Sequence, residues 1–479
     1  MMLASEAEPY AKTGGLGDVV SALSRGLAGS GHEVAVVLPL YETTTRVLAN
    51  RPQRVVSDNV SIRLGNQTRH VRVIRSDEDS VAWFFIDDPE YFGRPGLYGT
   101  SDGDYPDNAA RFITLVRGAL AIAADTFKPD ILHCHDWQTG LAPALLKTGQ
   151  DPAHPPGSLP TVFTIHNLGY EGLCGREVLA AIGLPDSLFN VYGLEFYDKV
   201  SFLKGGLIYA DRVNTVSEAY SREILTPEYG LGKEGITNLR KGDLTGILNG
   251  VDYERWDPRT DKLIAANYSA DDLSGKRKCK LDLLKEFGLS EADAGRPILG
   301  LVSRLVWQKG VDLVVAAAPE IVKAGGLLTV LGTGETGLEE ALKTLAKKFP
   351  GEVGVHIRHD ERLAHKLEAG ADIFLMPSRY EPCGLNQMYS LKYGTVPVVR
   401  ATGGLLDTIQ PWDGETGNGF RSSGESRDAF VKAIHEALDL YRDREAWSVI
   451  MRNGMSEDHS WGRSARRHLD IYEDLLQGS

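Results

Sequence analysis

The chain has 479 residues, which is too long for one hydrophobic core of ordinary size, so the length predicts two domains. Hydrophobic residues make up 42% and charged residues 24% of the chain, a composition typical of globular proteins in water. The net charge of −13 disfavours general binding to nucleic acid, so any cluster of Arg and Lys is expected to act locally.

The chain begins with a pattern that predicts a βαβ unit. The first ten residues, MMLASEAEPY, lack the basic and apolar regions of a signal peptide, and Met2–Ser5 is long enough only for a brief strand. Val19, Leu23 and Leu27 then fall on one face of a helix, and a Val-rich strand follows at 33–40.

A Gly-rich turn, KTGGLGD at 12–18, joins the first strand to this helix. Glycines allow the backbone to approach a ligand closely, and the start of a helix offers N–H groups to an anion. Lys12 adds a full positive charge, so the turn is a candidate anion site. The spacing is not G-x-G-x-x-G, so there is no dinucleotide fingerprint, and a turn that merely connects two elements is the alternative.

The region from 55 to 108 predicts a hairpin, a strand and a long loop. Residues 55–75 alternate as in a hairpin, and 81–86 form another strand. Residues 87–108 are rich in Gly, Pro, Asp and Tyr, which is typical of a long functional loop. Tyr98 lies in this loop as a candidate for stacking on a sugar, and ordinary packing is the alternative.

Polar groups follow several predicted strands at the carboxyl edge of the first sheet. The strand at 129–133 runs into His-Cys-His-Asp-Trp, the strand at 161–165 precedes His166, and the strand at 245–248 precedes Asn249. Ligands of open α/β sheets bind at this edge, so Asp136, His166 and Asn249 are candidate ligand groups, although a lone histidine often has a structural role. A metal site at 133–136 is disfavoured, because the sequence has no second cluster at ligand spacing.

The second half of the chain, after a boundary near Val251 and a charged segment at 257–280, predicts a second doubly wound parallel sheet. Strands are expected at 297–302, 327–331, 353–357, 372–376 and 395–401, and helices at 311–323, 361–369, 385–393, 428–441, 444–455 and 464–476.

Arg304 and Lys309 lie five residues apart, at the end of the strand at 297–302 and the start of the following helix. Two cations in this position suit a diphosphate. Two solvated surface charges are the alternative.

The stretch 377–405 adds candidates at the same edge of the second sheet. Glu381 and the N–H groups after Thr402 are expected to face one crevice, which suits a sugar hydroxyl beside a phosphate. Cys383 lies between Glu381 and a helix start, whose dipole lowers a thiol pKa; a small buried apolar residue is the alternative.

The cysteines and the apolar runs indicate the compartment. Cys134, Cys174, Cys279 and Cys383 lie far apart with no C-x-x-C pair, which favours reduced thiols in a cytoplasmic protein. No apolar run reaches the roughly 18 residues of a membrane span.

Taken together, the motifs resemble the bacterial glycogen synthases and plant starch synthases over nearly the whole chain. They are KTGGLGDV (12–19), HCHDW (133–137), FTIHNLGYEG (163–172), LNGVD (248–252), VSRLVWQKG (302–310), PSRYEPCGLNQMY (377–389) and RATGGL (400–405). The resemblance implies an α/β protein of two Rossmann-like, doubly wound domains with a deep interdomain cleft, the GT-B arrangement. The domains would be 1–250 on the acceptor side and 251–455 for the nucleotide sugar, with 456–479 packing back on the first.

The resemblance also implies the activity. Such enzymes transfer glucose from a nucleotide sugar, usually ADP-glucose in bacteria, to the non-reducing 4-hydroxyl group of an α-1,4-glucan, and they retain the α configuration. No metal or cofactor is expected, and the expected partners are ADP-glucose and glycogen, not nucleic acid or a membrane. Many retaining GT-B enzymes carry Glu-x7-Glu, but the second position here is Tyr389, as in the synthases, which disfavours sucrose-forming relatives. The oligomeric state and the preference for ADP-glucose over UDP-glucose stay open.

Each candidate residue receives a role by the same resemblance. Lys12, Gly15, Asp18 and Cys383 would belong to the nucleotide-sugar site, Arg304 and Lys309 would hold the diphosphate, Thr402 and Gly403 would add backbone donors, Glu381 would bind glucose hydroxyls and steady charge at the anomeric carbon, His166 would line the glucose, and Asp136, Tyr98 and Asn249 would surround donor glucose or acceptor.

Three rival functions remain at this point. A glucan phosphorylase on the same fold would show pyridoxal Schiff-base absorbance, and a sucrose-forming transferase would accept fructose. A non-catalytic glucan-binding protein is the rival from another class, and the intact set of Arg304, Lys309 and Glu381 argues against it.

Overall fold

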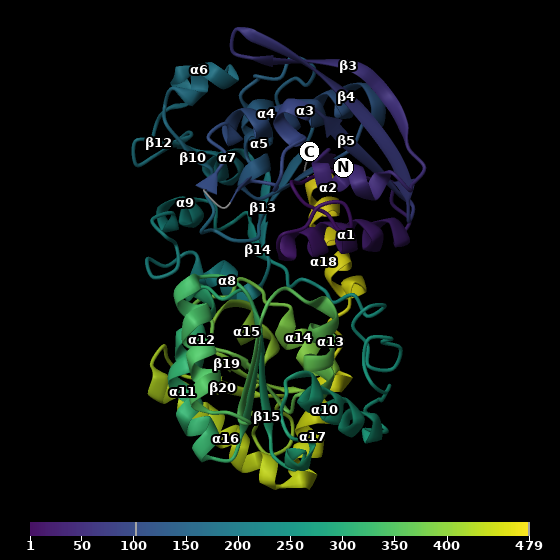
Figure 1. Cartoon of the computed structure of the whole chain (residues 1–479). Coiled ribbons are helices and arrows are strands. Elements are labelled where there is room, and N and C mark those ends of the chain that lie inside the picture. Colours follow the sequence, from purple (N-terminus) through teal and green to yellow (C-terminus); the bar gives the residue numbers. More distant parts are fainter. Residues whose placement is uncertain (101–102, 478–479) are drawn as a thin grey trace. The chain divides into compact units, whose positions relative to one another are not determined.

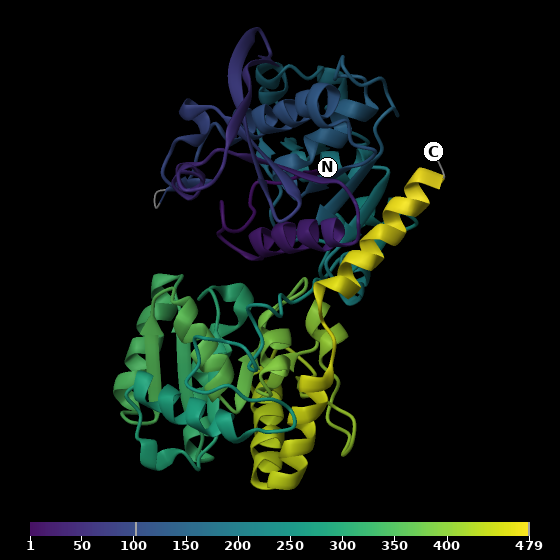
Figure 2. The ribbon, with the colours of Figure 1, turned by 90° about the vertical axis from the view of Figure 1, so that its right-hand side faces the viewer.

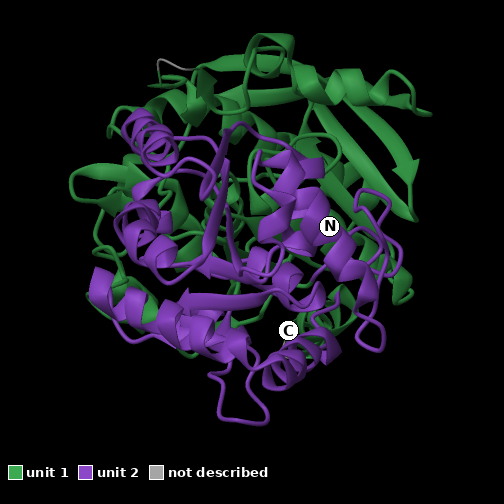
Figure 3. Cartoon of the chain, turned by 60° about the horizontal axis from the view of Figure 1, so that its bottom comes forward, with its two compact units in different colours: residues 1–216, 221–250, 461–479 green, residues 217–220, 251–460 purple. Residues whose placement is uncertain are grey.

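The computed structural model describes residues 1–100 and 103–477, which form two compact units (Figure 3). Unit 1 comprises residues 1–216, 221–250 and the chain from 461 onward, and unit 2 comprises residues 217–220 and 251–460. The main division thus falls at the expected boundary after residue 250, and the return to unit 1 comes at 461, not 456. Within the described part of the chain, no helix combines the length and apolar character that crossing a bilayer requires.

Unit 1 is built on a nine-stranded sheet with the order β14-β13-β9-β8-β1-β2-β5-β4-β3. Figure 1 labels β3, β4, β5, β13 and β14 of this sheet. The strands are β1 (Met2–Leu3), β2 (Val34–Pro39), β3 (Arg54–Leu64), β4 (Gln67–Glu78), β5 (Val81–Asp87), β8 (Leu132–His135), β9 (Thr161–Ile165), β13 (Arg212–Thr215) and β14 (Leu244–Gly246). All neighbours are parallel except β3–β4 and β4–β5, which form the predicted hairpin and its junction with the sheet. The short strand β1 lies centrally, between β2 and β8.

The helices of unit 1 cover this sheet, and the last helix of the chain belongs to them. They are α1 (Gly15–Gly29), α2 (Glu42–Leu48), α3 (Pro89–Phe92), α4 (Asn108–Ile122), α5 (Leu141–Lys147), α6 (Val178–Ile182), α7 (Phe202–Tyr209), α9 (Glu234–Leu239) and α18 (Trp461–Gln477), while α8 (Glu218–Glu223) lies across the division of the units. Trp461 and Ala465 of α18 share one apolar cluster with Leu23 and Leu27 of α1, so the C-terminal helix is part of the core of unit 1.

The strand that precedes Asp136 differs from its prediction. It is β8 at Leu132–His135, three residues later than the start expected at Pro129, because Lys128 has a left-handed backbone (φ 51°) and pairing begins only where Leu132 meets Thr161. His133 and His135 therefore lie inside the strand and are buried.

Unit 2 contains a six-stranded, fully parallel sheet of order β17-β16-β15-β18-β19-β20 with helices on both faces (Figures 1 and 2). Its strands are β15 (Ile298–Val302), β16 (Leu327–Gly332), β17 (Val353–Ile357), β18 (Ile373–Met376), β19 (Val396–Arg400) and β20 (Phe420–Ser422); its helices are α10 (Ser274–Glu286), α11 (Val311–Lys323), α12 (Thr336–Lys348), α13 (Glu361–Gly370), α14 (Asn386–Lys392), α15 (Gly403–Thr408), α16 (Arg427–Arg442) and α17 (Arg444–Ser456). The edge strand β20 was missed by the sequence analysis.

Alternating side chains of these strands pack into two separate cores. Leu299 and Leu375 pack with α11, α12 and α16, whereas Ile298 and Phe374 pack with α10 and α13. Successive side chains of a strand point to opposite faces, so a strand with helices on both sides is apolar throughout. This arrangement confirms the predicted doubly wound α/β class.

Candidate active site

The best-connected candidates in unit 2 are Glu381 and Lys309, which follow the neighbouring strands β18 and β15. Lys309 Nζ lies 2.6 Å from Glu381 Oε2, and Ser378 Oγ donates to the same oxygen over 2.9 Å. Glu381 is buried, so this pairing compensates a carboxylate that water reaches little. The two loops meet because Gly310 has a left-handed backbone (φ 66°), where a Cβ would lie 2.2 Å from the carbonyl oxygen of Pro377.

Arg304 is exposed and lies two residues after the end of β15. Lys309 ends a short 3-10 turn at Trp307–Lys309, directly before α11. Both cations thus lie at the carboxyl edge of the sheet of unit 2, as the sequence predicted, and Lys309 already has a carboxylate partner there.

The start of α15, at Thr402–Gly404, packs directly on the Glu381 loop. Gly403 has φ 46°, and a Cβ there would lie 1.9 Å from the carbonyl oxygen of Glu381. The N–H of Gly404 donates to that oxygen over 3.0 Å, and the N–H of Thr402 donates to Arg400 O over 3.0 Å. The backbone donor expected at Thr402 is therefore engaged within the protein, and the start of α15 holds the Glu381 loop in place.

Cys383 is buried in the same loop. Its carbonyl oxygen accepts a hydrogen bond from Gln387 Nε2 over 3.0 Å, and α14 begins three residues later, at Asn386. This burial agrees with the alternative of a small buried residue, and the lowered thiol pKa stays a prediction.

Replacement of Gly403 by alanine is expected to destabilise unit 2 by more than about 2 kcal/mol and to displace Glu381, because the added Cβ meets the Glu381 carbonyl and the backbone is left-handed. Chemical denaturation and activity measure the two effects. Gly414→Ala is the matched control, because Gly414 also has positive φ (105°) but nothing within 4 Å of its Cβ position. Equal losses in the two variants would contradict the proposed clash.

In unit 1, Lys12 lies beside two carboxylates. Its Nζ is 2.6 Å from Asp18 Oδ1 and 3.1 Å from Glu8 Oε2. Burial raises the pKa of Asp18 to about 7. Gly15 opens α1 and is exposed beside this group, with Asp18 in the first turn of the helix. A ligand phosphate at Lys12 thus has to share the ammonium group with acidic side chains of the chain itself.

Glu6 is a further polar group of this region that the sequence analysis missed. Its buried carboxylate accepts from Thr13 N (2.6 Å), Thr13 Oγ1 (2.7 Å) and Gly14 N (3.3 Å), so it shapes the Gly-rich turn. It also accepts from the hydroxyl of Tyr98, which lies 2.8 Å from Ser5 Oγ. Glu6 follows β1 as Asp136 follows β8, but a two-residue strand gave too little pattern to reveal that position.

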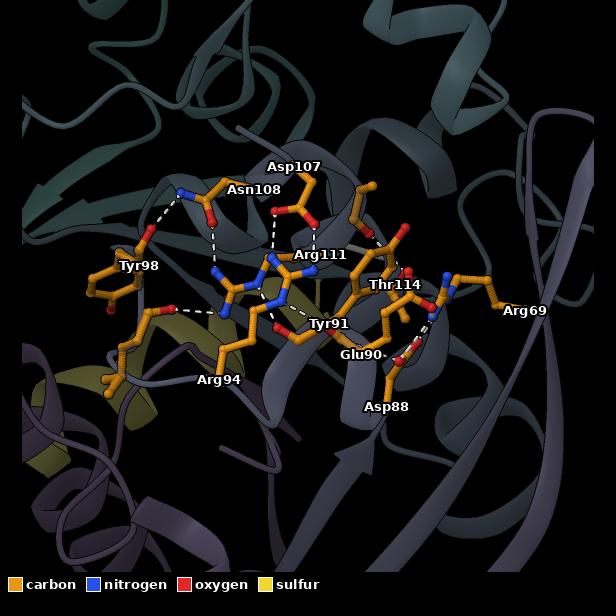
Figure 4. Close-up of polar contacts among 12 residues, drawn as sticks. Arg69, Asp88, Glu90, Tyr91, Arg94, Tyr98, Asp107, Asn108, Arg111 and Thr114 are labelled. Carbon is orange, nitrogen blue, oxygen red and sulfur yellow. Dashed lines mark hydrogen bonds and ion pairs between the residues drawn. The ribbon is translucent and has the colours of Figure 1, made fainter. Parts of the chain in front are cut away.

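The loop that carries Tyr98 is held by a buried arginine (Figure 4). Arg111 of α4 donates to Tyr91 O over 2.7 Å and to Leu97 O over 3.0 Å, and it also contacts Asn108 Oδ1. Asn108 Nδ2 in turn donates to Tyr98 O over 2.9 Å. The half-buried Tyr98 ring is therefore fixed by hydrogen bonds to its backbone and to its hydroxyl group, and the described part of the loop is held in one conformation by side-chain hydrogen bonds.

Asp136 has a strained backbone at the end of β8. Its φ of 57° and ψ of −178° fall in a region that residues other than glycine rarely occupy. Its Oδ1 accepts the N–H of His166 over 2.7 Å, and its own N–H donates to Thr164 O over 3.0 Å. Burial raises the pKa of Asp136 to about 7. Strain of this kind is concentrated at functional sites, and here it aims the carboxylate at the start of the His166 loop.

His166 follows β9 and is fixed from two sides. Asp136 holds its backbone, and His135 Nδ1 lies 3.0 Å from its Nε2. Burial lowers the pKa of His166 to about 3, so the ring is neutral at pH 7. Asn249 is buried in the segment that follows β14, two residues before the chain passes into unit 2 at Val251, and within the described residues it has no hydrogen bond to the other candidates.

The histidine and cysteine residues near β8 form no metal centre in the described parts of the chain, 1–100 and 103–477, where no group of three or more His, Cys, Asp and Glu side chains is placed to hold an ion.

Comparison with known proteins extends these observations over the whole chain. Residues 1–239 match the family described as starch synthase catalytic domain, and residues 285–453 match glycosyl transferases group 1. A glycogen synthase of Koribacter versatilis (strain Ellin345) is 47% identical over 479 residues, covering 99% of this chain and 97% of the relative. A glycogen synthase of Anaeromyxobacter sp. (strain Fw109-5) is 46% identical, with 99% of each chain covered.

A solved structure gives the same result. The catalytic domain of starch synthase IV from Arabidopsis thaliana, bound to ADP and acarbose, matches with a TM-score of 0.90 and 33% identity over 99% of both chains. A sucrose-phosphate synthase from Thermosynechococcus elongatus matches with a TM-score of 0.63 and 18% identity over 100% of this chain and 99% of its own, which shows a shared fold alone.

Proposed function

The chain belongs to the family of bacterial glycogen synthases and starch synthases, which are glycosyltransferases, and we propose that it transfers glucose from ADP-glucose to the non-reducing 4-hydroxyl group of an α-1,4-glucan with release of ADP. The family membership predicted from the motifs is confirmed, and with it a role in glycogen biosynthesis. ADP as the nucleotide is supported by the starch synthase IV structure, which contains ADP. We place the reaction in the cytoplasm.

The observation that carries the proposal is the contact of Lys309 with the buried Glu381. Departure of ADP builds negative charge on a phosphate oxygen, and a fixed cation stabilises it without the help of a metal. Lys309 and the exposed Arg304 supply such cations at one sheet edge. Glu381, held by Ser378, then binds glucose hydroxyls and offsets the positive charge that develops at the anomeric carbon.

The residues of unit 1 receive complementary roles. Lys12, Gly15 and Asp18 contact the nucleotide sugar. His166 and Asp136 contact the donor glucose, and Tyr98 and Asn249 lie near the glucose or the acceptor. In unit 2, the Glu381 loop beside the nucleotide is supported by Cys383, Thr402 and Gly403. No second carboxylate is assigned as a nucleophile, so we favour attack of the acceptor on the same face, through an oxocarbenium-like state, over a covalent glucosyl-enzyme.

A donor competition with glycogen tests the proposal. The purified full-length chain is incubated with glycogen and an equimolar mixture of ADP-glucose and UDP-glucose, and the released ADP and UDP are measured together with the linkage of the product. We expect ADP in excess and new α-1,4 bonds. Release of neither nucleotide would overturn the proposal, transfer to added fructose would favour the sucrose-forming rival, and UDP in excess would correct the donor.

Activity is expected to survive treatment with EDTA, because Arg304 and Lys309 supply the positive charge that a divalent ion would otherwise bring to the leaving diphosphate. Initial rates with and without the chelator measure this. Complete loss with EDTA, followed by recovery with magnesium or manganese, is the contradicting outcome.

A further inference from the structure

His135, the last residue of β8, is a buried histidine that the proposed mechanism does not use. Its Nδ1 lies 3.0 Å from Nε2 of His166, and its ring centroid lies 5.3 Å from that of His166. The ring centroid of His133 lies 4.2 Å from that of His135. His135 thus lies in the interior of unit 1 and contacts His166, the histidine that we assign to the donor glucose.

The contact between His135 and His166 requires one donor and one acceptor. Burial holds the pKa of His135 well below its usual range and lowers that of His166 to about 3, so both rings are neutral and each carries one proton. One ring must therefore donate to the other, and the direction of this bond decides which nitrogen of His166 carries its own proton.

The surroundings of His135 decide the direction. Its Nε2 is buried and has no hydrogen-bond partner among the described residues. A proton on Nε2 would leave a buried N–H without an acceptor, which is rarer in proteins than a buried acceptor without a donor. The proton of His135 therefore belongs on Nδ1, from where it is donated to Nε2 of His166. Nε2 of His166 then accepts, and its own proton lies on Nδ1.

His133 carries its proton on the other ring nitrogen, so the tautomer of each histidine is set by its own hydrogen-bond partners and not by the strand. Thr164 Oγ1 donates to Asn214 Oδ1, so it accepts from Nε2 of His133. The hydroxyl of Tyr472 lies 2.6 Å from Nδ1 of His133 and donates to it. His133 thus carries its proton on Nε2, although it lies only two residues from His135 on the same face of β8.

We propose that His135 is a positioning residue that fixes the His166 ring with its proton on Nδ1, so that His166 offers an N–H donor to a sugar oxygen. The inference rests on the proposed function, in which His166 contacts the donor glucose. A donor at this position binds an oxygen that accepts a hydrogen bond, such as a glucose hydroxyl, and would not serve as a general base.

Nitrogen NMR of the full-length protein labelled with ¹⁵N-histidine tests the tautomer directly. The His166 resonances are assigned by their loss in His166→Gln. We expect the shifts of His166 to show a protonated Nδ1 and a bare Nε2, and those of His133 to show the opposite. A proton on Nε2 of His166 would overturn the inference. This readout needs no activity, so it separates failure of the inference from failure of the proposed function.

Kinetics then test the consequence. His135→Phe removes the donor, and kcat/KM for ADP-glucose is expected to fall roughly 5- to 30-fold, as for loss of one hydrogen bond. His135→Asn, whose amide can replace Nδ1–H, is expected to keep at least about a third of the activity. His133→Phe is the matched control, because it changes a neighbouring buried histidine without touching His166, and its activity should stay within about threefold of the original. An unchanged kcat/KM in His135→Phe, or an equal loss in His133→Phe, would contradict the proposal; if His135→Phe does not fold, the tautomer measurement decides.

Discussion

Replacement of Lys309 by methionine is expected to lower kcat by at least about 100-fold. Lys309 Nζ lies 2.6 Å from Glu381 Oε2, so the ammonium group is held at the point where the leaving diphosphate and the glucose meet in the proposed reaction. The charge on the diphosphate grows as the bond to glucose breaks, and an interaction that strengthens in the transition state raises kcat more than it lowers KM. Steady-state kinetics with ADP-glucose and glycogen measure the effect.

The variant also leaves the buried carboxylate of Glu381 without its cation, which is expected to cost about 3–5 kcal/mol of stability. The double variant Lys309→Met with Glu381→Gln removes this penalty, because a neutral amide replaces the carboxylate. We expect the double variant to regain stability in denaturation experiments while its activity stays low. Recovery of activity together with stability would contradict the roles proposed for both Lys309 and Glu381.

The sequence predicted most of the strands of both units to within a residue or two, for a physical reason. Strands such as β2 and β18 are buried along their whole length, so they appear as short continuous apolar runs with a clear beginning and end. The failures lie where this pattern is absent. β20 has only three residues and lies at an edge, and the start of β8 depends on pairing with distant partners.

The candidate site was predicted as a set of residues but not as a set of contacts. Motifs indicated Lys12, Lys309 and Glu381, yet no local pattern shows that Lys12 is shared with Asp18 and Glu8, or that the Thr402 N–H is already engaged. Hydrogen-bond partners are set by side-chain and backbone geometry that appears only after folding. The donation of Ser378 to Glu381 belongs to the same class.

Replacement of Asp136 by glycine or by alanine is expected to reduce kcat/KM by about 100-fold or more in both variants, with very different effects on stability. Both remove the carboxylate that fixes the His166 backbone and that we expect to bind glucose hydroxyls. The backbone of Asp136 (φ 57°, ψ −178°) is natural for glycine but costs other residues about 1–3 kcal/mol. Glycine relieves this strain while alanine keeps it, so glycine should offset part of the lost charge-assisted hydrogen bond.

The comparison of the two variants isolates the backbone, because they lack the same carboxylate. We expect Asp136→Gly to be more stable than Asp136→Ala by about 1 kcal/mol in chemical denaturation, even though glycine usually lowers stability by increasing the freedom of the unfolded chain. If alanine proved the more stable, the strain at Asp136 would be disproved. The variant Asp136→Asn tests the charge of the side chain. Burial raises the pKa of Asp136 to about 7, so its carboxylate takes up a proton as the pH falls below 7. Activity that depends on the negative charge of Asp136 should fall over the same pH range. The amide does not titrate, so this acid limb of the pH profile should be absent in Asp136→Asn, whose activity should be low and nearly constant over the same range.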